Sequence, residues 1–186
     1  MATTLEQRLR RLERRYYARV FDEWKEEEHK RDKSGKFSKN STSPIGKKID
    51  LGSIFDQSIG GGGNKLFADF SIVNNKTVEL AKETIGLDIS GWKHSIDEAG
   101  IRHIMKQHGN EKIEANRGQR AVTKYDIEKL PEILDSFDSI EYTGTNELGN
   151  ETFLIRKKID GEVFCIQEVR KRRKKLAVKT MWIRKK

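Results

Sequence analysis

The fold is decided by the stretch Thr152-Phe153-Leu154-Ile155-Arg156-Lys157-Lys158-Ile159-Asp160-Gly161-Glu162-Val163-Phe164-Cys165-Ile166-Gln167-Glu168-Val169-Arg170. Asp160-Gly161 is a strong signal for a β-hairpin turn, and apolar runs flank it on both sides. The stretch therefore predicts two antiparallel strands, over 152–158 and 162–170. Side chains alternate along a strand, so we expect two faces in the second one. These are Val163, Cys165, Gln167 and Val169 on one face, and Phe164, Ile166, Glu168 and Arg170 on the other.

The neighbouring segments extend this hairpin into a sheet. Ile140-Glu141-Tyr142 opens a strand before a turn rich in Gly and Asn at 145–150. Residues 176–183 form a fourth strand after a basic turn at 171–175. In that strand, alternation places Lys179 and Met181 opposite to Val178, Thr180 and Trp182.

Helical patterns come before the sheet. Residues 77–85 have a helical period and end at Gly86, and residues 96–108 end at Gly109 after an acidic first turn and a basic last turn. A further helix runs from Lys124 to about Phe137, with a break near Lys129. Residues 67–73 are compatible with a short strand or a helix start. The fold class predicted is α+β, with N-terminal helices packed on a four-stranded antiparallel sheet.

The first 64 residues look different from the rest. Residues 1–31 predict an isolated amphipathic helix, because Leu5, Leu9, Leu12, Tyr16, Val20 and Trp24 recur at intervals of three and four. This helix can dock on a partner helix or a phage particle through residues 4–30, self-associate, or pack on the neighbouring domain. Residues 32–64 are polar and include Gly60–Gly63, which is typical of a flexible linker. The folded domain is then expected over 65–186.

Composition limits the classes of function. Formal net charge is +9, and residues 156–186 alone hold thirteen Lys/Arg against three Asp/Glu. Such clustering is typical of a surface that binds a polyanion, although a solvated basic tail is the alternative. One cysteine, Cys165, is expected to be buried, and with four scattered histidines it argues against a structural zinc site. We expect no cofactor and no metal. No apolar run approaches membrane-spanning length, so we expect a soluble, cytoplasmic chain without membrane contact.

Two of the four histidines lie in one short amphipathic segment, at His103 and His108. Histidine is the side chain whose ordinary pKa allows proton transfer near neutral pH. On a helix, His108 aligns with Gly100 and Ile104 at the edge of the core, whereas His103 lies about 140° around the axis. His108 is therefore the stronger catalytic candidate. The alternative is that a histidine before Gly109 only stabilises the helix end.

Two further segments carry groups suited to phosphate. Arg117, Gln119 and Arg120 flank a glycine, and guanidinium groups bind phosphate in a planar, bidentate way. The alternative is an ordinary solvated loop. Lys179-Thr180 offers a charge and a hydroxyl on the last strand. The basic strands and turn add Arg156, Arg170 and Arg172 as substrate contacts.

Taken in order, these residues resemble a known family. The set is His108-Gly109, Arg117-Gly118-Gln119, Thr123-x-x-Asp126-Ile127, Leu130-Pro131-Glu132-Ile133, Ile159-Asp160-Gly161 and Leu176-x-x-Lys179-Thr180-Met181-Trp182. The array, over about 67–184, resembles the phage-associated nuclease-like domains of the barnase–EndoU–colicin–RelE superfamily, which occur in phages and as toxin modules.

The resemblance implies metal-independent cleavage of RNA, in which a 2′-hydroxyl attacks the adjacent phosphate. It places the catalytic groups at His108, His103, Arg117, Lys179 and Thr180, with Gln119 as a substrate contact. The implied substrate is tRNA or another structured RNA, and the implied partner is a cognate immunity or antitoxin protein. It also implies that the chain is encoded by a phage or prophage and acts in the bacterial host. A chain that is associated with the virion or delivered into the cell is the alternative.

A rival hypothesis from a different class remains open at this point. The same fold can serve as a non-catalytic nucleic-acid-binding or phage structural protein, which would bind in a salt-sensitive way without cleavage. A transferase of the ADP-ribosyl type is a weaker third candidate, because the sequence carries no nucleotide fingerprint.

Overall fold

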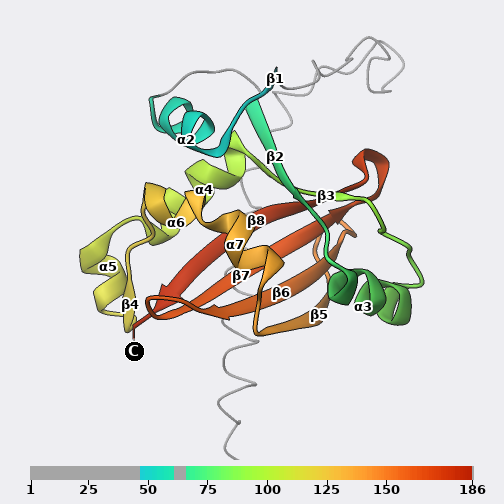
Figure 1. Cartoon of the computed structure of the whole chain (residues 1–186). Helices are drawn as coiled ribbons and strands as arrows, with labels where there is room; N and C mark the ends of the chain where they lie inside the picture. The colour runs from blue at the N-terminus through green and yellow to red at the C-terminus, as the bar shows by residue number, and fades with distance from the viewer. Residues whose placement is uncertain (1–46, 61–65, 186) are drawn as a thin grey trace, which may run out of the picture. The chain divides into compact units, whose positions relative to one another are not determined.

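The computed structural model describes residues 47–60 and 66–185 (Figure 1). The helix expected over 1–31 and most of the linker expected over 32–64 lie outside these residues. The compact unit comprises 46–145 and 150–186. Its helices are α2 (Leu51–Ile59), α3 (Asn75–Ile85), α4 (Glu98–His108), α5 (Glu111–Ala115), α6 (Lys124–Glu128) and α7 (Leu130–Asp135). Its strands are β1 (Lys47–Lys48), β2 (Leu66–Ile72), β3 (Lys93–Asp97), β4 (Gln119–Arg120), β5 (Ser139–Thr145), β6 (Glu151–Lys158), β7 (Glu162–Arg170) and β8 (Lys175–Arg184).

The fold is α+β, as predicted, and β5 to β8 form the expected antiparallel meander. The prediction of a four-stranded, purely antiparallel sheet is wrong, however. Within the described residues the sheet is mixed, with the order β1-β2-β3-β8-β7-β6-β5 and β4 beside β8. The additional strands β1 and β2 are attached to the meander through β3, which pairs parallel to β8 at Lys93, His94 and Ser95. A five-residue strand with four polar residues shows too little alternation to be recognised in the sequence.

Helix α4 begins later than predicted. Its N-cap is Asp97, whose carboxylate accepts a hydrogen bond from Gly100 N at 2.7 Å, so residues 96 and 97 belong to β3. The predicted end at Gly109 is confirmed, and its N–H donates to Met105 O. The break predicted near Lys129 is also confirmed, because α6 ends at Glu128 and α7 starts at Leu130 with Pro131 in its first turn.

Helix α2 lies inside the segment 32–64 that composition predicts as linker, so that expectation is corrected for residues 51–59. Asp50 caps the helix by accepting from Ser53 N at 2.8 Å. Ile54 is fully buried and belongs to the main hydrophobic core. Burying such a side chain contributes roughly 1.5–3 kcal/mol toward the ordering of this helix, and Leu51 and Phe55 pack against the same core. The ordered part therefore starts before residue 65.

The helices cover one face of the sheet, which we call the helix face (Figure 1). Val163 and Cys165 lie in the core cluster under the helices, as does Val178 of β8. The residues of β7 that alternate with them, Phe164, Ile166, Glu168 and Arg170, pair with Trp182, Thr180, Ala177 and Lys175 of β8. These eight residues occupy the opposite face, which we call the far face. The alternation predicted for β7 is confirmed.

Strand β8 has a β-bulge at Lys179, because Gln167 pairs with Val178 while Ile166 pairs with Thr180. The bulge shifts the pleat by one residue. Val178 and Met181 consequently share the core on the helix face, and the strict alternation predicted for β8 is wrong at this point. On its outer side, β8 pairs with β3 at residues 175–177 and with β4 at residues 183–184.

Helix α4 packs beside the part of β8 that lies between these two pairings. A Cβ on Gly100 would lie 3.0 Å from Val178 O, so the glycine allows the helix to approach the strand backbone closely. Ile101 and Ile104 of the same helix are fully buried in the main core. This contact fixes the position of His103 and His108 relative to β8.

Candidate active site

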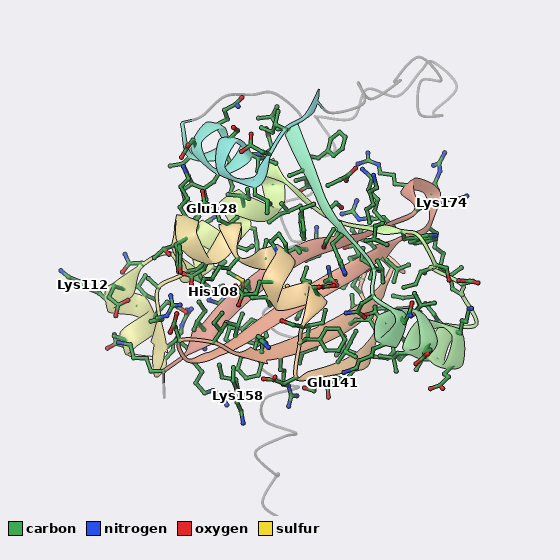
Figure 2. The ribbon with its side chains drawn as sticks, viewed as in Figure 1. His108, Lys112, Glu128, Glu141, Lys158 and Lys174 are labelled. Carbon is green, nitrogen blue, oxygen red and sulfur yellow. The ribbon has the colours of Figure 1, made fainter. Side chains whose placement is uncertain are left out.

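His108 ends α4 and is buried, with 7% of its surface exposed. Its Nδ1 lies 2.9 Å from Oε2 of Glu114, which is completely buried on α5. The chain returns to bring these groups together, because Asn110 caps α5 by accepting from Lys112 N and Ile113 N. Val122 N donates to the His108 carbonyl at 2.7 Å and fixes the helix end. Figure 2 shows His108 where α4, α5 and β8 meet.

Arg117 contacts the other oxygen of the same carboxylate. Its guanidinium donates to Glu114 Oε1 at 2.6 Å and to the carbonyl of Gln107 at 3.3 Å. The Glu114 carboxylate therefore accepts from both the imidazole and the guanidinium. Because the carboxylate accepts from Nδ1–H, the imidazole is held in the tautomer whose Nε2 carries the lone pair. Such an imidazole is oriented to act as a base.

Burial lowers the pKa of His108 below its ordinary value of 6.5, Glu114 opposes this, and the charge of Arg117 lowers it further. The net direction is downward, so the ring is neutral at pH 7. Neutral imidazole is the form that accepts a proton.

His103 faces a similar environment on the same helix. Burial, the largest cause, and the charges of Lys179, His108 and Lys106 together lower its pKa to about 4. These charges act on His103 because Lys179 and His108 are close to it in space. The structure thus brings two candidate histidines and the candidate lysine together, although the helical wheel separates the two rings by about 140°.

Lys179 and Thr180 lie in the bulged part of β8. The Lys179 ammonium is 3.8 Å from Oε2 of the buried Glu168, and Arg170 pairs with the other oxygen of that carboxylate. Thr180 is 3% exposed, and its hydroxyl has no hydrogen-bond partner within the described part of the chain. A buried hydroxyl without a partner is unfavourable by about 1–3 kcal/mol, and such groups are often found at functional sites.

A row of planar side chains crosses the far face next to His108. The His108 and Trp182 rings are 6.2 Å apart, and Trp182 stacks on Phe164 at 5.1 Å. The guanidinium groups of Arg156 and Arg184 lie 5.7 Å and 5.0 Å from the Phe164 ring centre. The predicted substrate contact Arg156 also pairs with Glu141 at 3.1 Å.

The remaining predicted contacts lie at two different places. Gln119 and Arg120 form β4, beside the end of β8. The Gln119 Oε1 is buried without a partner among the described residues, whereas Arg120 binds Asp126 through two donors at 2.8 and 2.6 Å. Those two bonds hold Arg120 in a structural ion pair, and its substrate role stays a prediction. Arg170 and Arg172 lie at the other end of β8, in and beside the turn Lys171–Arg173.

Sequence reasoning missed Glu114, the group that organises the site. It lies in the charged segment Glu111-Lys112-Ile113-Glu114, where nothing distinguishes a buried carboxylate from an exposed one. Trp182 was assigned to a face but not to the site. The signal available for each was its position near a recognised motif: Glu114 follows His108 by six residues, and Trp182 follows Lys179 by three.

The structure adds two observations on other classes of site. Among the described residues, no group of three or more His, Cys, Asp or Glu side chains is arranged to hold a metal ion. In the same residues, no helix is both long enough and apolar enough to cross a membrane.

The sequence profile of one family matches residues 71–186, from the end of β2 through β8. The profile describes phage-Barnase-EndoU-ColicinE5/D-RelE like nuclease3. The chain belongs to this family. The match covers α4, α5 and the sheet that carries the candidate active site, and it defines a nuclease-like domain. No curated protein and no solved structure matches the chain.

Proposed function

We propose that the chain is a metal-independent endoribonuclease. The hydrogen bond between His108 and the buried Glu114, in a domain of a nuclease-like family, is the observation that carries this proposal. Nε2 of His108 accepts the proton of a ribose 2′-hydroxyl, whose oxygen attacks the adjacent phosphorus. The bond from phosphorus to the 5′-oxygen breaks, and that oxygen takes a proton from solvent. The products are a 2′,3′-cyclic phosphate and a 5′-hydroxyl.

Cationic groups around His108 support this reaction. The pentacovalent phosphate carries more negative charge than the ground state, so fixed positive charges stabilise it preferentially. Lys179 acts electrostatically on His103, and Arg117 is held by Glu114 with 46% of its side chain exposed. We assign the phosphate to these two cations. Thr180 and Gln119 supply hydrogen bonds, consistent with the lack of a described partner for Thr180 Oγ1 and Gln119 Oε1.

His103 is assigned a positioning role. With a pKa lowered to about 4 it is neutral at pH 7, so it is a poor proton donor for a leaving group. Its neutral ring can still form a hydrogen bond to the substrate next to Lys179. The structured RNA expected as substrate, tRNA above all, remains part of the proposal.

The proposal is tested with purified protein, total tRNA and mRNA, in the presence of EDTA. We expect cleavage that leaves 2′,3′-cyclic phosphate ends, which polynucleotide kinase treatment with and without its phosphatase activity detects. His108→Ala is expected to reduce the rate by about 10²–10⁴-fold, since proton transfer by a positioned side chain contributes that much. Arg102→Ala, on the exposed side of the same helix, is the matched control and should cleave normally.

Two results would overturn the proposal. One is intact RNA under all conditions with protein whose circular dichroism shows a folded chain. The other is unchanged cleavage by His108→Ala. Tight, salt-sensitive RNA binding without any cleavage would support the non-catalytic alternative instead.

A further inference from the structure

Most basic side chains in the last part of the described chain form an ion pair with a carboxylate. In the last part of the described chain, Arg156 pairs with Glu141, Lys175 with Asp69, Arg184 with Glu162 and Lys185 with Glu111. Arg170 and Lys179 share Glu168. Much of the positive charge that the sequence concentrates in this region is therefore balanced locally. The charge that remains uncompensated is what a polyanion would sense.

That uncompensated charge is concentrated in the turn between β7 and β8, formed by Lys171, Arg172, Arg173 and Lys174. We call this turn the basic hairpin tip. All four side chains are exposed, and none of them makes an ion pair among the described residues. Lys174 also adopts a left-handed backbone conformation with φ of 51°, which favours Gly or Asn over other residues. The turn thus keeps a lysine at a position where the backbone would favour a different residue.

The basic hairpin tip and the candidate active site lie at different positions along the same strand. Figure 2 shows Lys174 at the tip of the hairpin, far from His108. From Lys175 to Trp182 the strand advances by seven residues, or roughly 20 Å at about 3.3 Å per residue. Lys175, Thr180 and Trp182 share the far face, because their partners on β7 alternate. A single extended ligand on this face can therefore contact both places.

We propose that the basic hairpin tip binds phosphates of the RNA that is cleaved at His108, several nucleotides away from the cleaved bond. This inference rests on the proposed function and defines its substrate as a polynucleotide, not a short oligonucleotide. Phosphate contacts of this kind fix the register of the substrate without reading its sequence. The affinity they provide falls as the salt concentration rises, because the release of counterions from the RNA on binding then becomes less favourable.

The test compares two substrates of different length. The variant K171A/R172A/R173A removes three charges and leaves Lys174 in its unusual conformation. For a single-stranded 20-nucleotide RNA we expect kcat/KM to fall at least tenfold, through KM, with kcat within twofold of wild type. For a ribodinucleoside monophosphate we expect no change, because it cannot reach the tip. The control K76A/K82A/R102A removes three charges from α3 and α4 and should behave as wild type on both substrates.

A binding measurement separates this inference from the proposed function. In the His108→Ala background, the affinity for the 20-nucleotide RNA is measured against salt for both triple variants. The slope of log K against log salt should decrease by about 2 for the hairpin variant, at about 0.7 per phosphate contact on a single strand. The inference would be overturned if the hairpin variant bound the 20-nucleotide RNA as well as the wild type does, or if its kcat/KM fell equally on the dinucleotide. Stronger binding of the chain to anionic lipid vesicles than to RNA would also overturn it. If the wild type binds the 20-nucleotide RNA through the basic hairpin tip but does not cleave it, only the proposed function is overturned.

Discussion

At the scale of single residues, one buried carboxylate determines the state of the candidate base. Glu114 accepts from His108 and from Arg117, and the two partners act on the imidazole in opposite directions. Burial is the largest cause and lowers the pKa of His108. The Glu114 carboxylate raises this pKa, and the Arg117 guanidinium lowers it. Changing either neighbour should therefore move the titration of His108 in a known direction.

The pH dependence of kcat/KM tests this coupling. The base must be neutral, so activity should fall as pH decreases through the pKa of His108, which lies below 6.5. Glu114→Gln removes the carboxylate that raises this pKa, and the acidic limb should move to lower pH. Arg117→Gln removes a charge that lowers it, and the limb should move to higher pH. Both variants should also be slower than wild type at their optimum.

A shift of both limbs in the same direction would contradict this assignment of Glu114 and Arg117. Lys112→Gln is a suitable control, because this exposed lysine lies on the same short helix as Glu114. Its profile should overlay that of the wild type.

The sequence pointed to His108 as a candidate but not to Glu114, the carboxylate that the structure places beside it. Gly109 marks the end of a helix, and the neighbouring Arg117 and Lys179 have the chemistry of a phosphate site. The approach of Glu114 depends on the turn at Asn110 and on how α5 folds back, which no short-range pattern encodes. The proximity of His103 to Lys179 depends on a bulge in a distant strand. Both are tertiary features.

At the scale of elements, the turn between β6 and β7 supports the end of β8. Gly161 has φ of +119°, and a Cβ at this position would lie 2.6 Å from Arg184 O. Two separate restrictions therefore select glycine: the backbone conformation and the close approach of β8. Arg184 follows Trp182 by two residues on the same face, so this turn also supports the row of planar side chains next to His108.

Gly161→Ala should destabilise the fold by about 2–4 kcal/mol, because backbone strain of roughly 1–3 kcal/mol adds to a steric clash. Gly144→Ala is the matched control. Gly144 has φ of +94° but nothing within 4 Å of its Cβ position, so only the strain should appear. Urea unfolding at pH 7 measures both variants. Equal destabilisation of the two would show that the contact with Arg184 is unimportant.

The elements that sequence reasoning found are those with a local signal. Asp160-Gly161, Pro131 and Gly109 each restrict the backbone at one position, and the observed boundaries lie within one or two residues of them. The elements it missed, β3 and α2, are short, and β3 is also polar. They are ordered by long-range contacts, β3 by its parallel pairing with β8 and α2 by burial of Ile54. Such long-range contacts cannot be recognised from the residues that neighbour the element in the sequence.

At the scale of the whole molecule, two hydrophobic clusters are joined by a buried polar pair. One cluster contains Val178 and the other contains Leu176, neighbours on the helix face of β8. Between them, Gln167 bonds His94 Nδ1 at 2.8 Å across β8. His94 Nε2 and Gln167 Oε1 are buried without a partner among the described residues. The centre of the core therefore tolerates a neutral imidazole but not a charged one.

This pair predicts that the protein loses stability in mild acid. Burial lowers the pKa of His94 to about 4 against an ordinary value of 6.5, so the unfolded chain binds the proton first. The free energy of unfolding should then fall between pH 6.5 and pH 4, by about 3 kcal/mol from this residue. Chemical denaturation at pH 7, 5.5 and 4 measures the loss, which His94→Gln should reduce.

An independent measurement covers the case in which His94→Gln does not fold. In the wild type, the imidazole signal of His94 followed by NMR should titrate near pH 4. A midpoint near 6.5 would falsify the prediction.

The central position of β8 has a consequence for the order of folding. This strand follows all other described strands in the chain, yet it lies between β3 and β7 and supports α4. A ribosome-bound chain that ends before residue 175 can form the β5–β6–β7 meander and the β2–β3 pair, but it lacks the strand that joins them and against which α4 packs. Closing a contact between residues 93 and 175 is slow, because a long loop must be ordered before the pairing stabilises it. The arrangement of α4 against β8, which carries the candidate active site, is therefore completed only after β8 has been synthesised.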